Sequence, residues 1–314
     1  MPSTPPPQTI PLPQTFHHNT TTHSHTIHWT TLGDPSPPPL IFIHGTPWSS
    51  AVWNDYALTL ARTFHIHLFD NPGFGHSPLG TPLPSHQHDP ETTNSIALDA
   101  DLSDQTAIFA ALYTHWSQTW PPVYQKRAHV IAHDHGGLMS LRAHLLHGLQ
   151  YASLCLINVV ALGPFGQPLF KLVAENQVVF EALTRPVFEG VVEAYIRDAA
   201  FTELSKERME MLKEPWVRRG EEGRKGFVRQ MVQANYRSTE AVEGRYGEVG
   251  ASVPVLVVWG VEDRWIPVET AGRLRERLNA RELMLIEGAG HLVMYDQPGR
   301  LGVELGWWLN EVRG

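Results

Sequence analysis

The chain has 314 residues, 42% of them hydrophobic and 18% charged, and its formal net charge is −8. This composition predicts a globular protein with one large domain, or one domain and an insertion, and the acidic balance argues against nucleic acids and membranes as partners. No apolar run approaches the roughly 18 residues that cross a bilayer, no secretory signal is visible, and the single cysteine, Cys155, cannot form an internal disulfide, so we expect a cytoplasmic protein.

Residues 1–22 are the first segment with a character of their own. They are rich in Pro, Thr and Gln and nearly free of charge, which predicts a flexible or surface-hugging N-terminal arm. Five of the chain's 18 histidines precede Trp29, but they lack the usual spacing of metal ligands. We expect no metal site and no cofactor.

After this arm, short apolar runs alternate with helical patterns, which predicts a mostly parallel sheet with helices on both faces. The expected strands are residues 26–31, 40–43, 66–69, 129–132, 153–159, 255–259 and 283–286. The expected helices are residues 51–62, 95–116, 136–146, 268–278 and 299–311.

The alternation is interrupted once, between residues 163 and 250, where the pattern indicates several amphipathic helices and no strand. A helical block inserted between two strands of such a sheet is typical of a cap domain. We therefore predict a core domain of residues 23–162 and 251–314, covered by a helical cap of residues 163–250.

The most informative segment is Ala132-His133-Asp134-His135-Gly136, which joins an expected buried strand to an expected helix. Small residues two positions before and after the centre are typical of a nucleophile elbow, a strained strand-to-helix turn that exposes a reactive side chain. The central residue is Asp134. A carboxylate in that place attacks an sp³ carbon and forms an alkyl ester, whereas a serine there is acylated.

Reactive residues also follow three other expected strands. His44-Gly45-Thr46-Pro47 follows one strand, Glu262-Asp263 follows another, and Gly290-His291 follows the last. Because ligands bind beyond the carboxyl ends of parallel strands, we expect these residues to meet Asp134. His291 is the expected general base, Asp263 the acid that orients it, and the backbone N–H groups of Thr46 and His135 the donors to the ester oxyanion.

In this order, the motifs resemble those of the α/β-hydrolase superfamily, and in particular its Asp-nucleophile branch of epoxide hydrolases and haloalkane dehalogenases. The resemblance extends from Pro38 to the C-terminus and includes the turn Asp70-Asn71-Pro72-Gly73-Phe74-Gly75-His76-Ser77. It implies the α/β-hydrolase fold, a mostly parallel eight-stranded sheet flanked by helices, with an inserted helical cap. It also implies a hydrolase that acts through an alkyl-aspartyl ester.

Three polar residues near these motifs have competing interpretations. Glu262 neighbours Asp263 and is an alternative for the orienting acid. Ser77 follows Gly75-His76, but Pro78-Leu79 come next where an elbow needs a small residue and a helix, so a turn is expected. Asp296 is expected to cap a helix rather than to take part in catalysis.

The leaving group distinguishes the two reactions of the branch. The resemblance assigns the acid that protonates an epoxide oxygen to cap tyrosines, and the donors that stabilise a halide to a Trp beside the nucleophile and a second Trp or an Asn. Positions 135 and 46 hold His and Thr, so both halide donors are missing. Ala234-Asn235-Tyr236-Arg237 resembles the cap segment of epoxide hydrolases. Tyr236 is therefore the expected acid, with Tyr195 as a second candidate. The His135 ring could either donate to the leaving oxygen or line the pocket.

The sequence thus predicts an epoxide hydrolase for a small hydrophobic substrate. The alternatives are a haloalkane dehalogenase and, outside enzymes, a small-molecule receptor on the same fold. We expect His44, Trp48, His133 and Phe165 to line the pocket, and the protein to be a monomer or homodimer.

An acidic substrate is not expected. Fluoroacetate dehalogenases have a similar elbow, but the arginines that bind their substrate's carboxylate follow the nucleophile. Here His135 and Leu138 stand at those positions.

Overall fold

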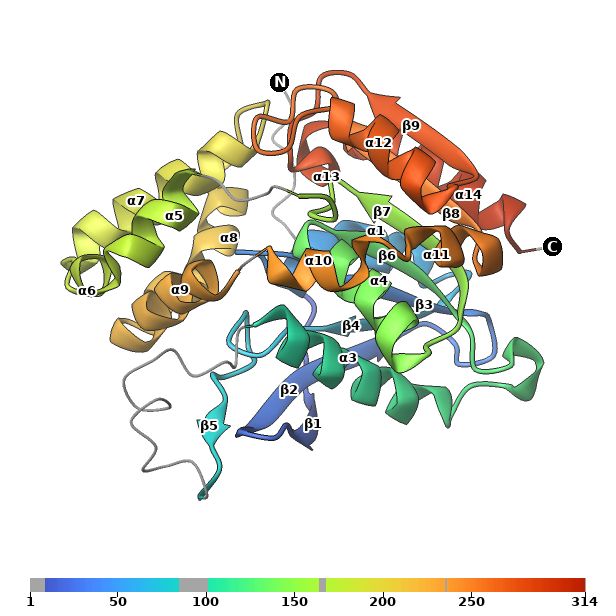
Figure 1. The fold of residues 1–314 in the computed structure, drawn as a ribbon, viewed down its shortest axis with the longest axis horizontal. Helices are drawn as coiled ribbons and strands as arrows, with labels where there is room; N and C mark the ends of the chain where they lie inside the picture. Colours follow the sequence, from blue (N-terminus) through green and yellow to red (C-terminus); the bar gives the residue numbers. More distant parts are fainter. Residues whose placement is uncertain (1–8, 85–100, 164–167, 235, 314) are drawn as a thin grey trace.

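The structure, a computed structural model, describes residues 9–84, 101–163, 168–234 and 236–313. These residues form a nine-stranded sheet with helices on both faces (Figure 1). The strand order is β1-β2-β4-β3-β6-β7-β8-β9, and β5 pairs with β2 outside this path. The strands are β1 (Gln14–Asn19), β2 (His23–Leu32), β3 (Pro39–Ile43), β4 (His65–Phe69), β5 (Thr81–Pro82), β6 (Ala128–His133), β7 (Tyr151–Ile157), β8 (Val255–Gly260) and β9 (Glu282–Ile286).

The six strands from β4 to β9 along this order are parallel, whereas β2 pairs antiparallel with β1, β4 and β5. Every residue of β3, β6 and β8 is buried, as expected for parallel strands that are covered on both faces. Alternate side chains of one strand enter different cores: Leu40 and Phe42 pack on one face of the sheet, and Ile41 and Ile43 on the other.

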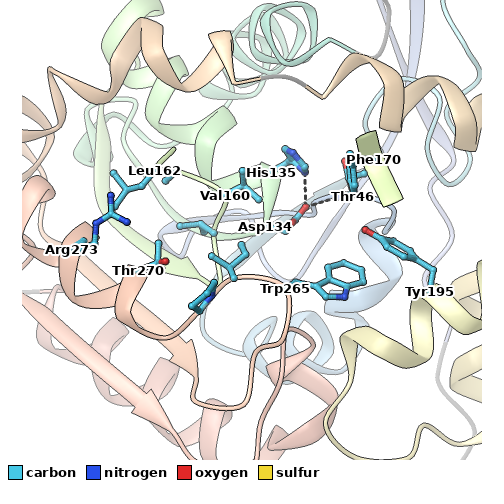
Figure 2. Close-up of a pocket in the computed structure, with 14 residues that line it drawn as sticks. Thr46, Asp134, His135, Val160, Leu162, Phe170, Tyr195, Trp265, Thr270 and Arg273 are labelled. Atoms are coloured by element: carbon cyan, nitrogen blue, oxygen red, sulfur yellow. Dashed lines mark hydrogen bonds and ion pairs between the residues drawn. The ribbon is translucent and has the colours of Figure 1, made fainter. Parts of the chain in front are cut away.

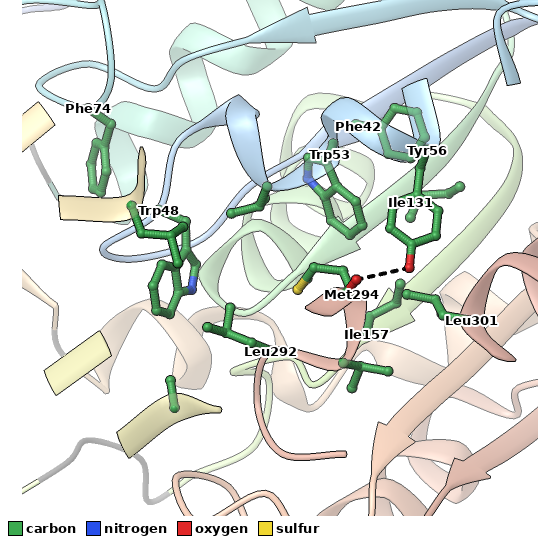
Figure 3. Packing of buried hydrophobic residues seen from close by; sticks show 14 of the residues in the cluster. Phe42, Trp48, Trp53, Tyr56, Phe74, Ile131, Ile157, Leu292, Met294 and Leu301 are labelled. Carbon is green, nitrogen blue, oxygen red and sulfur yellow. Dashed lines mark hydrogen bonds between the residues drawn. The ribbon is translucent and has the colours of Figure 1, made fainter. Parts of the chain in front are cut away.

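Two groups of helices cover these faces. One core includes residues of α1 (Asn54–Leu60), α13 (Val293–Asp296) and α14 (Pro298–Glu311). Figure 3 shows its aromatic and aliphatic side chains and the 3.2 Å hydrogen bond from the Tyr56 hydroxyl to the Met294 carbonyl. The other core includes residues of α3 (Leu102–Ser117), α4 (His135–His147), α11 (Tyr246–Ser252) and α12 (Glu269–Leu278). Burial of both faces fixes the sheet between them.

The expected alternation is confirmed, and the seven expected strands correspond to β2, β3, β4, β6, β7, β8 and β9. The sheet has nine strands, against the eight that the resemblance implied and the seven expected from the residues; β1 and β5 are the two strands that were not expected. β1 corrects the prediction of a flexible arm over residues 1–22: it pairs with β2 from Gln14 to Asn19, and Ile10 and Leu12 before it are buried. Residues 1–8 of that arm lie outside the described residues.

Between β7 and β8 the described residues form helices and no strand. Five of them contact one another and stand beside the sheet in Figure 1, and we call this group the cap. They are α5 (Pro168–Glu175), α6 (Gln177–Glu181), α7 (Arg185–Ala199), α8 (Lys206–Arg218) and α9 (Glu221–Gln233). In contrast, α10 (Arg237–Glu243) contacts α4, and α11 contacts α4 and α12. The end of the helical block therefore packs with the core layer rather than with the cap.

None of the helices in the described segments is long and apolar enough to span a bilayer.

Candidate active site

Asp134 lies at the sharp turn between β6 and α4, with φ 53° and ψ −128°. A positive φ is uncommon for a residue with a side chain, and such strain is typical of functional turns. The turn also needs close approach of the neighbouring backbone. A Cβ atom on Gly136 would lie 2.6 Å from the His44 carbonyl oxygen, and one on Gly45 would lie 2.3 Å from Asp134 Oδ1. Both positions therefore require glycine.

The two carboxylate oxygens of Asp134 have different surroundings. Oδ1 accepts hydrogen bonds from the Thr46 backbone N–H at 2.7 Å and from the His135 ring Nδ1 at 2.9 Å, which Figure 2 marks with dashed lines. Oδ2 lies 3.2 Å from His291 Nε2. Because a carboxylate oxygen can only accept, Nδ1 of His135 carries a proton. One oxygen is thus held by two donors, and the other faces His291. The Thr46 N–H is the expected donor, whereas His135 donates to Oδ1 from its ring and not from the backbone N–H that was expected.

Asp263 is hydrogen-bonded to the other nitrogen of the same histidine. His291 Nδ1 lies 2.9 Å from Asp263 Oδ2, and the backbone N–H groups of Trp265 and Ile266 donate to Oδ1. Glu262, the alternative acid, instead accepts from the Ala289 N–H at 3.0 Å. The structure thus brings Asp134, His291 and Asp263 together in one hydrogen-bonded chain, at the carboxyl ends of three parallel strands.

Asn158 is a residue of this chain that the sequence analysis missed. It follows β7 and donates from Nδ2 to Asp263 Oδ2 at 2.6 Å, while its Oδ1 accepts from the Gly260 N–H. A polar residue inside the apolar run Leu156-Ile157-Asn158-Val159-Val160, at the end of an expected strand, was the signal that could have identified it.

Burial and charge have opposite effects on the ionisation of this chain. Burial opposes ionisation of Asp134, but His135 and His291 outweigh it and hold the pKa of the carboxyl well below its ordinary value. Burial likewise disfavours a charged His291, but Asp263 and Asp134 raise its pKa to about 10. The pKa of Asp263 is lowered, because His291 and Asn158 outweigh burial. The resting site is therefore an imidazolium between two carboxylates.

Three of the expected pocket residues support the site instead of lining the pocket. His44 donates from Nδ1 to the Gly45 carbonyl and accepts at Nε2 from the Asn71 N–H, which fixes the loop that carries Thr46. His133 donates from Nε2 to the His291 carbonyl oxygen at 2.9 Å, and burial lowers its pKa to about 3, so the ring is neutral. Trp48 is buried and stacks on Trp265. The prediction that these side chains line the pocket is wrong, and Phe165 lies outside the described residues.

A cavity of about 130 Å³ opens in front of Asp134. Asp134, Thr46 and His135 lie at its reactive end, beside Trp265, and α5 and α7 contribute Phe170 and Tyr195 (Figure 2). Its other described lining residues are Val159, Val160, Ala161, Leu162, Ile266, Pro267, Thr270 and Arg273. The wall is thus apolar along its length, with polar groups at both ends.

Tyr236 does not lie at this cavity. Its side chain is partly exposed, packs over Gly163 and hydrogen-bonds Glu243 at 3.2 Å. This corrects its assignment as the group above the nucleophile, because residues 236–243 fold onto the core layer and not into the cap. Tyr195, the second candidate, lines the cavity, and its buried hydroxyl has no hydrogen-bond partner among the described residues. Burial raises the pKa of this hydroxyl well above its ordinary value, and the negative charges of Asp134 and Asp198 add smaller contributions in the same direction.

The sequence profile of the alpha/beta hydrolase family matches residues 40–302 of this chain. The chain belongs to that family. This hydrolase is similar to an alpha/beta hydrolase fold protein from Burkholderia ambifaria, with 34% identity and a TM-score of 0.81. The similarity covers 95% of the present chain and 98% of the Burkholderia chain.

Two further comparisons differ in the activity of the relative. A pimeloyl-[acyl-carrier protein] methyl ester esterase from Vibrio campbellii is 24% identical over 272 residues, which cover 84% of this hydrolase and 91% of the esterase. A haloalkane dehalogenase from Bradyrhizobium elkani shares the fold with a TM-score of 0.71 at 18% identity, over 96% and 99% of the two chains. Neither relationship identifies the leaving group.

Proposed function

We propose that this hydrolase acts through an alkyl ester on Asp134, and that its substrate is an epoxide with a small apolar body. The observation that carries the proposal is the arrangement of the Asp134 carboxylate, with Oδ1 held by Thr46 and His135 and Oδ2 facing Nε2 of His291. This is the geometry that an attacking carboxylate and its later oxyanion need.

In the first step, Asp134 Oδ2 attacks a ring carbon of the epoxide. A carbon–oxygen bond forms to the enzyme as the ring carbon–oxygen bond breaks, and the ring oxygen takes a proton. Tyr195 supplies that proton, because its hydroxyl is buried, protonated and directed into the cavity. The apolar wall excludes water from the reacting carbon.

In the second step, His291 Nε2 removes a proton from water, and the hydroxide attacks the ester carbon of Asp134. The negative charge develops on Oδ1, where the Thr46 N–H and the His135 ring N–H donate. Collapse of this intermediate breaks the ester bond and releases a diol. The departing alkoxide takes the proton of the new carboxyl group of Asp134. The proton that His291 held at rest passes to the tyrosinate before water is activated, and the proton then taken from water restores the imidazolium, so that epoxide and water give diol and unchanged enzyme.

The charges of the site assign an order to these steps. While Asp134 is ionised, His291 holds a proton and cannot act as a base. Esterification neutralises Asp134 and removes one of the two carboxylates that favour the imidazolium. The pKa of His291 then falls, and the histidine becomes a base when the ester that it must hydrolyse is present.

Two observations favour an epoxide over a haloalkane or an ester. Trp265 is the pocket-lining indole among the described residues, but its N–H donates to Asp198 at 2.9 Å rather than into the cavity. An ester is disfavoured because a carboxylate that attacks an ester carbonyl is expelled more readily than the alkoxide. Esterase activity of the relatives therefore does not transfer to a chain with Asp134 at the elbow.

The variant His291→Gln tests the covalent step, with styrene oxide as the probe. The variant is expected to become alkylated but not to hydrolyse the ester, since the base acts in the second step. Mass spectrometry should show the protein heavier by one complete epoxide molecule, and peptide mapping should place the adduct on Asp134. Asp134→Asn is the matched control and should show no adduct.

The outcomes separate the alternatives. A haloalkane that adds its alkyl group without halogen, while no epoxide reacts, would replace the epoxide proposal by a dehalogenase. Normal turnover by His291→Gln would contradict the role of His291.

The acid is tested by Tyr195→Phe with Tyr236→Phe as its control. General acid catalysis contributes typically ~10²–10⁴-fold, and we expect Tyr195→Phe to slow the alkylation step by about that factor. Tyr236→Phe should leave it unchanged, because that hydroxyl contacts Glu243 at the surface. Rapid-mixing measurements of alkylation distinguish the two, and the reverse ranking would restore Tyr236 as the acid.

A further inference from the structure

Arg273 is the one cation among the described residues that line the cavity. It lies on α12, one turn after Thr270, so both side chains lie on the same side of that helix. Figure 2 shows them on one side of Asp134, with Tyr195 and Phe170 on the other. The cavity therefore has a reactive end and a basic end.

The guanidinium of Arg273 is available to a ligand. The side chain is exposed, and within the described part of the chain it forms neither an ion pair nor a hydrogen bond. Other arginines near the site are engaged: Arg264 pairs with Asp198, and Arg219 donates to the carbonyls of Gly75 and Ser77.

The space between the two ends limits what can join them. The wall from Val159 to Leu162 and the facing Ile266 and Pro267 offer apolar side chains. A cavity of about 130 Å³ is close to the roughly 150 Å³ of an apolar cavity that holds benzene. The part of the substrate that lies inside is therefore the size of one ring or a short alkyl chain.

We propose that the substrate carries a carboxylate, bound by Arg273 and the Thr270 hydroxyl, and separated from the reacting carbon by a small apolar body. This deepens the proposed function and rests on it for the position of the reacting carbon. A guanidinium binds a carboxylate through two parallel N–H donors, and the threonine hydroxyl adds a third donor. An acidic substrate was not expected from the sequence, because the carboxylate-binding arginines of similar enzymes follow the nucleophile, whereas Arg273 lies on α12.

The charge of Asp134 gives this anchor a second role. A carboxylate ligand is repelled by ionised Asp134 at one end of the cavity and attracted by Arg273 at the other. Both effects favour the same orientation, with the anion at the mouth and the apolar body toward Asp134. The anchor thus selects the substrate and directs it.

Binding of two probes that differ in charge tests this proposal without turnover. Isothermal titration calorimetry compares 4-phenylbutyrate with the neutral 4-phenylbutyramide. We expect the carboxylate to bind the wild-type protein about tenfold more tightly than the amide. Arg273→Ala should remove this preference and leave amide binding unchanged, whereas Arg275→Ala, the same change on α12 outside the pocket lining, should retain it.

Each result decides the matter. A carboxylate that does not bind at millimolar concentration, or that binds no better than the amide, overturns the anchor. An equal loss in Arg273→Ala and Arg275→Ala assigns the effect to the overall charge of α12 and also overturns it. Because these measurements need no reaction, they remain decisive if His291→Gln forms no adduct, and failure of the covalent mechanism is distinguished from failure of the anchor.

Discussion

At the scale of single residues, the properties of the site follow from one substitution in a common turn. An elbow serine is neutral at rest, whereas Asp134 brings a charge into a buried site. That charge is stabilised by Thr46, His135 and His291 and in turn keeps His291 protonated. The nucleophile and the base are therefore coupled before any substrate binds.

This coupling predicts a measurable change in the titration of His291. Asp134→Asn removes one of the two carboxylates that raise the pKa of His291. Burial, which lowers this pKa, is then opposed by Asp263 alone, so the pKa falls from about 10 toward the ordinary value. Titration of the His291 ring followed by NMR checks this. Asp55→Asn removes the same charge at an exposed site and should leave the value unchanged. An unchanged pKa in Asp134→Asn would contradict the proposed order of the two steps.

The same raised pKa has a consequence for stability. The folded-state pKa of His291 lies above that of an unfolded histidine, so the protonated ring stabilises the fold fully below the unfolded value. That contribution is lost as the pH rises through about 10. The direction is opposite for Asp134, whose contribution is lost as the pH falls.

How far the sequence predicts a site residue depends on whether its position is set locally. Asp134, Asp263 and His291 follow directly from strand ends, and the structure brings them together as expected. The assignment of Tyr236 as the acid is wrong, because a short motif match does not determine how a helical segment packs. Here α10, which follows Tyr236, packs on α4. The ring of His135 had two interpretations, a donor to the leaving oxygen or a lining group of the pocket; it lines the cavity and donates to Asp134. The contact that the His135 ring makes depends on its side-chain rotamer, which the sequence does not determine.

At the scale of elements, buried parallel strands are the most predictable parts of the chain. β3 and β8 are buried throughout and consist of continuous apolar runs, and β6 has an apolar centre between two buried histidines. β1 was missed because it is an edge strand with largely exposed side chains, joined to the sheet by backbone hydrogen bonds along one side. Its pairing therefore leaves almost no hydrophobic pattern in the sequence.

The helices between β7 and β8 illustrate a second limit. Their amphipathic patterns indicate helices, but the pattern does not reveal which surface each helix covers. α7 turns Tyr195 toward the cavity, while α10 and α11 continue the core layer. The boundary of the cap is consequently set by tertiary contacts, which the pattern of a short stretch of sequence does not reveal.

At the scale of the whole molecule, the cap and the catalytic histidine are joined through Asp296. Its carboxylate accepts hydrogen bonds from the Gly290 N–H, next to His291, and from Phe201 and Thr202, just after α7. The Leu292 N–H also donates to the Ala199 carbonyl. The residue was expected to cap a helix, but it instead links the helix that carries Tyr195 to the loop that carries the base.

Loss of this link should affect stability and catalysis together. Asp296→Ala leaves the buried Gly290 N–H and the part-buried N–H groups of Phe201 and Thr202 without their acceptor, which costs about 2–4 kcal/mol of unfolding free energy. The variant should also lower kcat/KM by about tenfold or more, because small displacements of catalytic groups slow the reaction strongly. Denaturant unfolding and hydrogen exchange at Phe201, Thr202 and Gly290 measure the first effect, and steady-state kinetics the second.

Thr202→Val is the matched control, because it removes the hydroxyl contact and leaves the backbone donors bound to Asp296. Thr202→Val should lower the unfolding free energy by about 1 kcal/mol and leave kcat/KM nearly unchanged. If Asp296→Ala loses stability while kcat/KM is unchanged, Asp296 holds the fold but not the geometry of the site. If both fall and exchange rises at Gly290 as well as at Phe201, one carboxylate positions the cap and the base as a unit. The separation of Tyr195 and His291 then depends on a residue that hydrogen-bonds to the backbone next to His291 and just after the helix of Tyr195, in addition to the Trp265 ring that packs against both.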